Sequence, residues 1–252
     1  MLAIERKNII YARLCSEGKV MVNDLAAEFG VSDETIRRDL DKLQKEGLAE
    51  QFYGGAIKAE NTFHDLPFHV RQNSNIGEKK DIADKALRLI KDNSYSAVDS
   101  STTALEVMKA AHTCRNLNVI TNSVEILLEF SQKPDWNIIC TGGNLRTGSL
   151  SLVGNIAANV LSKFNVDLCI CSSKGLDVEK GCTESTESEA SMKSAFIKSA
   201  KHKLLVADHS KFNRISFAKV CDITEFDTIV TDITPSEEWL EFCQAENINL
   251  IY

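Results

Sequence analysis

The sequence VSDETIRRDL, at residues 31–40, decides the fold of the first part of the chain. Ser32 can cap a helix at its N-terminus, and the two acidic residues after it suit the positive end of the helix dipole. Apolar residues then recur at intervals of four and three positions, which gives the helix one buried face: Ile36, Leu40 and Leu43. Gly47 can end the helix. The stretch therefore predicts an amphipathic helix.

Two further helical patterns precede this helix, at residues 4–16 and 22–29. The second pattern ends at Gly30, and the short turn that follows makes the pair typical of a helix-turn-helix. The solvent side of the last helix would concentrate groups that can donate hydrogen bonds to phosphates or base edges. These candidate DNA contacts are Ser32, Thr35, Arg37 and Arg38.

Residues 48–57 then predict two short strands joined by a glycine turn, which makes a wing. Together these patterns predict a winged helix-turn-helix DNA-binding domain over residues 1–58. A three-helix packing module with solvated arginines is the alternative. Net charge does not favour DNA, because residues 1–58 carry 9 Lys and Arg against 10 Asp and Glu, and the remainder carries 20 against 26. The case rests on the local placement of Arg37 and Arg38.

The composition excludes several other classes of protein. No apolar run approaches the roughly 20 residues of a membrane span, and the N-terminus does not resemble a signal peptide. We therefore expect a cytoplasmic protein without a membrane partner. The 8 cysteines include no C-x-x-C pair, and the 5 histidines form no cluster. We predict free thiols and neither a metal nor a cofactor.

Residues 59–75 have mixed polarity and predict a linker. From residue 76 to residue 252, strand patterns alternate with helix patterns, which predicts a mostly parallel sheet with helices on both faces. The predicted strands are 94–99, 118–121, 136–141, 166–172, 203–207, 228–231 and 248–252. The predicted helices are 80–90, 103–111, 124–130, 155–162, 187–200 and 237–245. The second domain is thus expected to be a Rossmann-like α/β domain.

In such sheets ligands lie beyond the carboxyl ends of the strands, so the residues after each strand are candidate ligand contacts. After the first strand, a hydroxyl-rich segment enters a helix, where hydroxyls and backbone N–H groups can hold a phosphate: Asp99, Ser100, Ser101, Thr102 and Thr103. Later strand ends add Asn122, Gly143, Lys174 and Lys211. A simple helix-capping cluster and solvated lysines are the alternatives. Taken together, these residues suit a small polyhydroxylated anion.

Both halves of the chain resemble the DeoR family of bacterial regulators. In the first half the resemblance rests on TIRRDL at residues 35–40 and GGA at 54–56. In the second half it rests on DSSTT at 99–103, TN at 121–122, GG at 142–143, DHSK at 208–211 and TD at 231–232. The resemblance implies a recognition helix around Thr35 to Arg38. It also implies an effector domain similar to ribose-5-phosphate isomerase and glucosamine-6-phosphate deaminase.

This resemblance implies a repressor of a carbohydrate operon that binds double-stranded operator DNA as a dimer or tetramer and responds to a phosphorylated sugar. Three residues depart from the family pattern. Gln51 stands where the family usually has a basic residue, and Tyr53 where it often has histidine. Ser101 replaces a glycine, so its side chain would either restrict the phosphate loop or donate a hydrogen bond to the phosphate.

The resemblance to sugar-phosphate enzymes leaves a second hypothesis, an isomerase or deaminase with an accessory helix domain. Proton transfer next to a carbonyl needs a positioned carboxylate or histidine. The nearby carboxylates are Asp99, Glu184, Glu187 and Asp208. No motif assembles them as an acid and base pair, so we predict a regulator that is not an enzyme.

Overall fold

The computed structural model describes residues 2–45, 47–59 and 66–252. The chain divides into two compact units, Met1–Ser74 and Asn75–Tyr252. Each unit buries its own set of apolar side chains, so each has the core of an independent domain.

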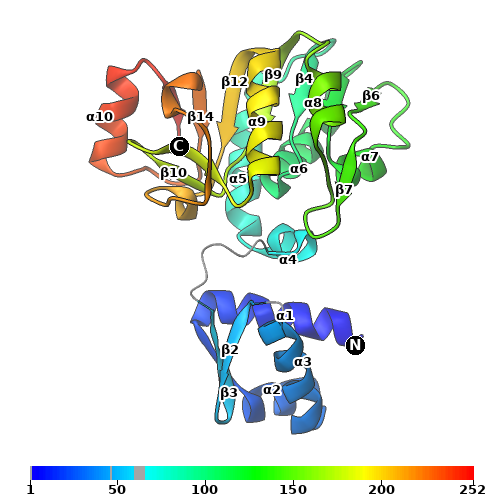
Figure 1. Cartoon of the computed structure of the whole chain (residues 1–252), viewed down its shortest axis with the longest axis vertical. Helices are drawn as coiled ribbons and strands as arrows, with labels where there is room; N and C mark the ends of the chain where they lie inside the picture. The colour runs from blue at the N-terminus through cyan, green and yellow to red at the C-terminus, as the bar shows by residue number, and fades with distance from the viewer. Residues whose placement is uncertain (1, 46, 60–65) are drawn as a thin grey trace. The chain divides into compact units, whose positions relative to one another are not determined.

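The first unit is a winged helix-turn-helix, as predicted (Figure 1). Its elements are α1 (Ala3–Glu17), β1 (Lys19–Met21), α2 (Val22–Phe29), α3 (Asp33–Lys45), β2 (Ala49–Phe52) and β3 (Gly55–Lys58). The predicted apolar face of α3, formed by Ile36, Leu40 and Leu43, is fully buried. Gly30 and Gly47 follow α2 and α3 with φ angles of 63° and 69°. The wing strands β2 and β3 form a sheet with β1, which the sequence patterns did not predict.

Helix α4 (Phe68–Asn73) lies within the stretch 59–75 that was predicted as a linker. Its Val70 is buried in the core of the first unit, and His69 Nε2 lies 3.0 Å from Asn8 Oδ1 on α1. Residues 60–65 of that stretch lie outside the described residues. Helix α4 therefore belongs to the first unit, and the functional domain boundaries stay a prediction.

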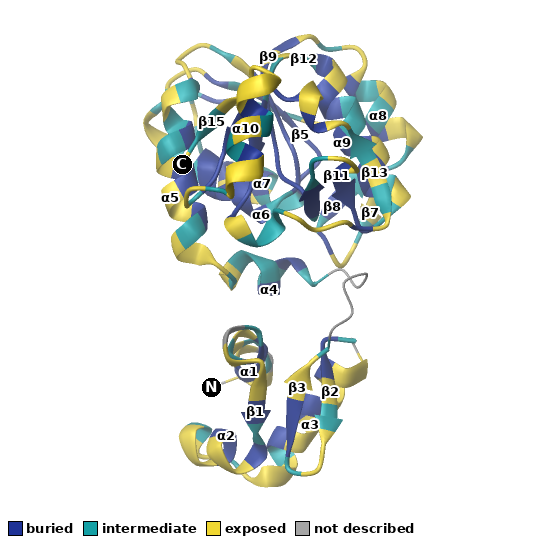
Figure 2. Cartoon of the chain, turned by 90° about the vertical axis from the view of Figure 1, so that its left-hand side faces the viewer, coloured by how far each residue is buried: buried dark blue, intermediate teal, exposed yellow. Residues whose placement is uncertain are grey.

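The second unit is built on a seven-stranded parallel sheet with the strand order β15-β14-β12-β9-β4-β5-β6. Its strands are β4 (Tyr95–Val98), β5 (Asn118–Thr121), β6 (Asn137–Cys140), β9 (Val166–Cys171), β12 (Ala200–Val206), β14 (Thr228–Val230) and β15 (Asn249–Ile251). Its helices are α5 (Ile76–Ala86), α6 (Thr102–Ala110), α7 (Val124–Glu129), α8 (Asn155–Leu161), α9 (Glu187–Ser199) and α10 (Glu237–Ala245). Helices α5, α6 and α7 cover one face of the sheet, and α8 and α9 cover the other (Figure 1; Figure 2). The predicted α/β fold is confirmed.

The strand order reverses between β4 and β9, which makes a topological switch point. On one side β5 and β6 follow β4, and on the other side β12, β14 and β15 follow β9. The register pairs Val98 with Ile170 near the ends of the two strands. The residues that leave β4 and β9 therefore start side by side at the carboxyl edge of the sheet.

Two smaller sheets, absent from the sequence prediction, start at this same edge. The hairpin of β7 (Asn144–Arg146) and β8 (Ser151–Val153) follows β6. The hairpin of β10 (Gly175–Asp177) and β11 (Gly181–Glu184) follows β9 and pairs with β13 (Ala218–Cys221). Both hairpins begin within a few residues of a main-sheet strand, so they flank the region where a ligand is expected.

Within the described ranges, no helix is long and apolar enough to cross a membrane. In the same part of the chain, no three His, Cys, Asp or Glu side chains gather as a possible metal site. All 8 cysteines are free thiols, of which only Cys140 is exposed.

Candidate functional site

The four residues predicted to contact DNA lie at the N-terminal end of α3. Ser32 Oγ accepts a hydrogen bond from the Thr35 backbone N–H at 3.3 Å, so it caps the helix. Arg38 Nε lies 3.3 Å from Glu34 Oε1, and its side chain is 74% exposed. Arg37 is also exposed and makes no hydrogen bond or ion pair with any described residue. An ion pair as exposed as that of Arg38 is worth little, so both guanidinium groups can turn to a phosphate or a base edge.

Asp39, the acidic residue within TIRRDL, does not face solvent. It is 1% exposed, and its Oδ2 accepts a hydrogen bond from Arg6 Nε at 2.6 Å. Arg6 lies on α1, so this buried ion pair fixes α1 against the candidate recognition helix. The local sequence does not indicate this pair, because acidic residues beside arginines are usually solvated. The helical spacing offered a signal, since Asp39 follows Ile36 by three positions and so shares its buried face.

The wing is tied to α3 by one of the residues that depart from the family pattern. Gln51 Nε2, on β2, donates a hydrogen bond to Asp41 Oδ1, on α3, at 2.6 Å. Tyr53 lies at the turn between β2 and β3 and is fully exposed. Gln51 thus has a structural partner, whereas Tyr53 presents its ring to solvent.

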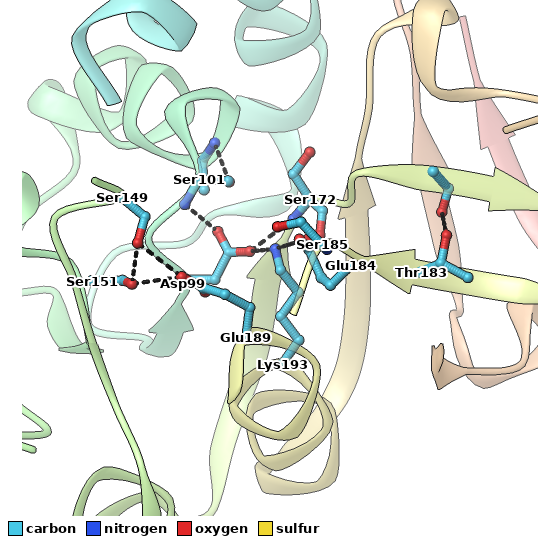
Figure 3. Close-up of polar contacts among 12 residues, drawn as sticks. Asp99, Ser101, Ser149, Ser151, Ser172, Thr183, Glu184, Ser185, Glu189 and Lys193 are labelled. Atoms are coloured by element: carbon cyan, nitrogen blue, oxygen red, sulfur yellow. Dashed lines mark hydrogen bonds and ion pairs between the residues drawn. The ribbon is translucent and has the colours of Figure 1, made fainter. Parts of the chain in front are cut away.

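At the carboxyl edge of the large sheet, Asp99 joins the two strands of the switch point (Figure 3). Its Oδ1 accepts a hydrogen bond from the Ser101 N–H at 2.9 Å, and its Oδ2 accepts one from the Ser172 N–H at 3.0 Å. Because Asp99 follows β4 and Ser172 follows β9, one buried carboxylate fixes both strand-end loops. A carboxylate is an acceptor only, so Asp99 positions the loop and does not itself suit contact with a phosphate.

Lys193, on α9, supplies the countercharge to Asp99. Its Nζ forms an ion pair with Asp99 Oδ2, lies 3.2 Å from Glu184 Oε1 and donates a hydrogen bond to the Ser172 carbonyl at 2.7 Å. Burial disfavours the ammonium, but the negative charges of Asp99 and Glu184 outweigh it and hold the pKa of Lys193 well above its usual value. The local sequence does not single out Lys193, because a lysine within a helix is usually a solvated charge.

The hydroxyl-rich segment after Asp99 surrounds the N-terminus of α6. Ser101 has φ −74° and ψ 149°, an extended conformation that any residue adopts, so its side chain does not restrict the loop backbone. Its Oγ accepts a hydrogen bond from the Ala104 N–H at 3.1 Å, which leaves the hydroxyl hydrogen able to donate. The other hydroxyl residues of the segment are buried: Ser100, Thr102 and Thr103.

Asn122 and Gly143, which follow β5 and β6, both contact the hairpin of β7 and β8. Asn122 is 1% exposed and donates a hydrogen bond from Nδ2 to the Leu152 carbonyl at 3.0 Å. Gly143 has a φ angle of 109°, and a Cβ at this position would lie 2.7 Å from the Val153 carbonyl oxygen. Gly143 is therefore required for the close approach of two backbone segments.

A third group of polar residues follows β12. Asp208 is 1% exposed and accepts hydrogen bonds from Asn75 Nδ2 at 3.2 Å and from the Ser210 N–H at 3.0 Å. Lys211 Nζ lies 4.0 Å from Asp208 Oδ2. Burial acts to raise the pKa of Asp208, but the charge of Lys211 and the hydrogen bonds from Ser210 outweigh it and leave that pKa below its ordinary value.

The predicted effector residues thus lie at one edge of the sheet, in groups around Asp99, the β7–β8 hairpin and Asp208. Lys174 stands next to the first group, where its N–H donates a hydrogen bond to the Thr183 carbonyl at 3.1 Å. Hydroxyls and lysines beside a helix N-terminus suit the binding of an anion. The buried carboxylates Asp99 and Glu184 share the charge of Lys193, an arrangement that suits loop positioning better than proton transfer.

Some solved structures share part of this fold. Ribose 5-phosphate isomerase A from Methanocaldococcus jannaschii is 14% identical, with a TM-score of 0.41 over 55% of this chain and 55% of its own. A chain of the tetrameric eIF2B-beta2-delta2 complex from C. thermophilum is 14% identical, with a TM-score of 0.48 over 68% of this chain and 60% of its own.

Sequence comparison places both units in one family. Residues 6–62 match the DeoR-like helix-turn-helix domain, and residues 74–233 match the DeoR C terminal sensor domain. The HTH-type transcriptional regulator GolR of Listeria innocua is 34% identical over 92% of this chain and 91% of its own length. The glycerol-3-phosphate regulon repressor of Escherichia coli is 30% identical over 99% of each chain. This chain therefore belongs to the DeoR family and is a transcriptional regulator, not an enzyme.

Proposed function

We propose that a phosphorylated sugar binds at the carboxyl edge of the seven-stranded sheet and controls the binding of this regulator to its operator. The observation that carries the proposal is the pair of hydrogen bonds by which Asp99 joins the ends of β4 and β9. They hold a hydroxyl-rich helix N-terminus at the switch point, where α/β sheets bind ligands. The name of the Escherichia coli relative, a repressor of the glycerol-3-phosphate regulon, supports a phosphorylated ligand.

In this proposal each group of the site has a separate task. The hydroxyl segment, with Ser100, Ser101, Thr102 and Thr103, holds the phosphate, and Asp99 positions that segment. Lys174 and Lys211 add positive charge, which offsets the repulsion between the phosphate and the negatively charged carboxylates nearby. Asn122 contacts the ligand from β5, and Gly143 lets the β7–β8 hairpin close against the strand ends.

The DNA contacts are assigned to α3, through Ser32, Thr35, Arg37 and Arg38. We propose that the protein acts in the cytoplasm as a homo-oligomeric repressor. Two recognition helices would then read half-sites about one helical turn, roughly 34–36 Å, or a multiple of it apart. The effector acts by binding one arrangement of the linked domains more tightly than another. By linkage, it changes the affinity for DNA by the same factor by which DNA changes the affinity for the effector.

A thermal melt of the full chain against triose, pentose and hexose phosphates tests the effector. A ligand at 100 times its dissociation constant stabilises the folded state by roughly 2.7 kcal/mol. Lys211→Ala should lose most of the shift. Lys201→Ala is the matched control, because Lys201 is an exposed lysine at the amino end of the same strand β12. A shift that survives Lys211→Ala, or no shift with any compound, would contradict the proposal.

Operator binding tests the assignment of α3. Arg37→Ala should weaken binding about 5- to 150-fold, because a bidentate guanidinium contact to a base is worth about 1–3 kcal/mol. Lys45→Ala is the control, since Lys45 is exposed at the other end of α3. Equal affinities for the wild type and Arg37→Ala would refute the role of Arg37.

A further inference from the structure

Three buried polar atoms at the carboxyl edge make no hydrogen bond within the described part of the chain: Asn122 Oδ1, Ser173 Oγ and Ser185 Oγ. Their residues are 1%, 7% and 7% exposed. A buried polar group without a partner is costly and uncommon in folded proteins. Three such atoms at the place where the fold binds ligands therefore point to contacts that a ligand completes.

Position separates these atoms from two of the other three unpaired hydroxyls of the described residues, those of Ser94 and Ser96. Ser94 precedes β4 and Ser96 lies within it, and Ser216 precedes β13. By contrast, Asn122 and Ser185 directly follow β5 and β11, and Ser173 is the second residue after β9. Ser94 and Ser96 thus lie away from the ligand edge, whereas Ser216 lies beside the end of β11, because Ala218 pairs with Glu184 in the antiparallel sheet.

Ser173 and Ser185 lie at the same end of the β10–β11 hairpin, because Gly175 pairs with Thr183 in its antiparallel register. The Ser172 carbonyl and Glu184 Oε1 both contact Lys193 Nζ, at 2.7 Å and 3.2 Å. Figure 3 shows Asp99, Ser172, Glu184 and Ser185 gathered around the amine end of Lys193. Ser173 and Ser185 thus each adjoin in sequence a residue of one buried ion cluster, beside the hydroxyl segment that follows β4.

The charge of that cluster limits what the ligand can carry there. Lys193 contributes one positive charge against the two carboxylates of Asp99 and Glu184, so the cluster has a net negative charge. A ligand carboxylate at this position would be repelled. Ligand hydroxyls fit, because each can donate to Asn122 Oδ1 or a carboxylate and can accept from a serine hydroxyl.

We infer that Asn122, Ser173 and Ser185 bind the hydroxyl groups of the effector's carbon chain, and that the negative ion cluster selects phosphorylated sugars or polyols with an uncharged end over phosphorylated sugar acids. The inference rests on the proposed function, since it assigns the part of the same ligand that is not the phosphate. It makes Ser173 and Ser185 specificity-determining residues.

Isothermal titration of the full-length protein with two matched pairs of compounds tests the selection. Glycerol 3-phosphate is compared with 3-phosphoglycerate of the same spatial arrangement at C2, and glucitol 6-phosphate with 6-phosphogluconate. The members of each pair then differ only in a CH₂OH or a carboxylate. In any pair that binds, we expect the neutral member to bind at least tenfold more tightly. Equal or tighter binding of the acid overturns the inference.

Substitution of the serines tests their contacts. Ser185→Ala and Ser173→Ala should each weaken the neutral member about tenfold, the value of one hydrogen bond, and leave the affinity for inorganic phosphate unchanged. Ser96→Ala is the matched control, because it removes a buried unpaired hydroxyl from the middle of β4 and should change neither affinity.

The outcomes separate the two proposals. If a sugar phosphate binds the wild type but Ser185→Ala and Ser173→Ala behave like Ser96→Ala, the hydroxyl contacts are wrong while the proposed effector stands. If none of the four compounds nor any sugar phosphate of the melting panel binds the wild type, the proposed effector is wrong and this inference falls with it.

Discussion

Glu189 and Lys193 lie one turn apart on α9 and connect two separate parts of the effector unit. Glu189 Oε1 accepts hydrogen bonds from Ser149 Oγ at 2.9 Å and Ser151 Oγ at 2.6 Å, and Arg146 Nη1 lies 3.2 Å from it. Lys193 binds Asp99 and Glu184 at the switch point. One helix therefore links the β7–β8 hairpin to the loops that follow β4 and β9.

Lys193→Met should destabilise the effector unit by about 3–5 kcal/mol, because it leaves two buried carboxylates without their countercharge. The side chain of Lys193 is 8% exposed, so solvent cannot replace the ammonium. Urea unfolding followed by circular dichroism measures the loss. Lys198→Met, on the exposed side of the same helix, should change stability by less than about 0.5 kcal/mol. A loss below about 1 kcal/mol for Lys193→Met would mean that the carboxylates find other partners.

Glu189→Ala should loosen the β7–β8 hairpin without unfolding the sheet. It removes the acceptor shared by the hydroxyls of Ser149 and Ser151. These hydroxyls lie 2.6 Å apart and can still bond each other, so one of them loses its acceptor at a cost of about 1–3 kcal/mol. Hydrogen exchange read by mass spectrometry should become faster in residues 144–153. Glu187→Ala is the control, because Glu187 is exposed on the first turn of α9. Its Oε1 accepts a hydrogen bond from Ser191 Oγ of the same helix at 3.0 Å. Unchanged exchange in the hairpin would show that it does not depend on Glu189.

The main sheet could be predicted because each of its strands is a short apolar run next to a helical pattern. The strand at 118–121 coincides with its prediction. The hairpins could not be predicted, since β7 and β8 have 3 residues each and no clear alternation. Side chains distant in sequence support them instead, as Glu189 supports Ser151 across 38 positions.

The candidate site divides in the same way: some of its residues can be predicted from their neighbours in sequence, whereas the roles of others depend on residues distant in sequence. The segment 99–103 was found because its hydroxyls follow a strand in the sequence itself. Lys193 was missed because its partner Asp99 lies 94 positions away, and nothing in the local pattern distinguishes it from a solvated lysine. Gly143 can be predicted as part of a strand end. That the position admits no side chain depends on the Val153 carbonyl, which only the fold brings near.

Gly143→Ala should destabilise the effector unit by about 1–3 kcal/mol. A side chain there must adopt a φ of 109°, and its Cβ would lie 2.7 Å from the Val153 carbonyl oxygen and 3.0 Å from Ala157 Cβ. Gly148→Ala tests the same change in the neighbouring loop, where no atom lies within 4 Å of the added Cβ and φ is ordinary. Urea unfolding should separate the two variants. Equal stabilities would show that the backbone at Gly143 relaxes at no cost.

The pair of His209 and Asp232 should give the effector unit a dependence on pH. His209 Nδ1 lies 2.5 Å from Asp232 Oδ2, and this hydrogen bond raises the pKa of His209 above its ordinary 6.5. Burial acts to raise the pKa of Asp232, but the hydrogen bonds from His209 outweigh it and leave that pKa below 3.8. The stabilisation from His209 is thus complete below pH 6.5 and is lost as the pH rises through the raised pKa.

Asp232→Asn removes the negative charge. It keeps an oxygen that can accept the hydrogen bond from the backbone N–H of His209, which in the wild type goes to Asp232 Oδ1 at 2.7 Å. The NMR titration midpoint of His209 should lie above 6.5 in the wild type and fall toward 6.5 in the variant. The difference in unfolding free energy between the two proteins should be largest near pH 5–6, roughly, and should shrink at higher pH. The signals of the other 4 histidines should coincide in both proteins, which controls for a general change of structure. A His209 midpoint that is the same in both proteins would show that Asp232 does not raise the pKa of His209.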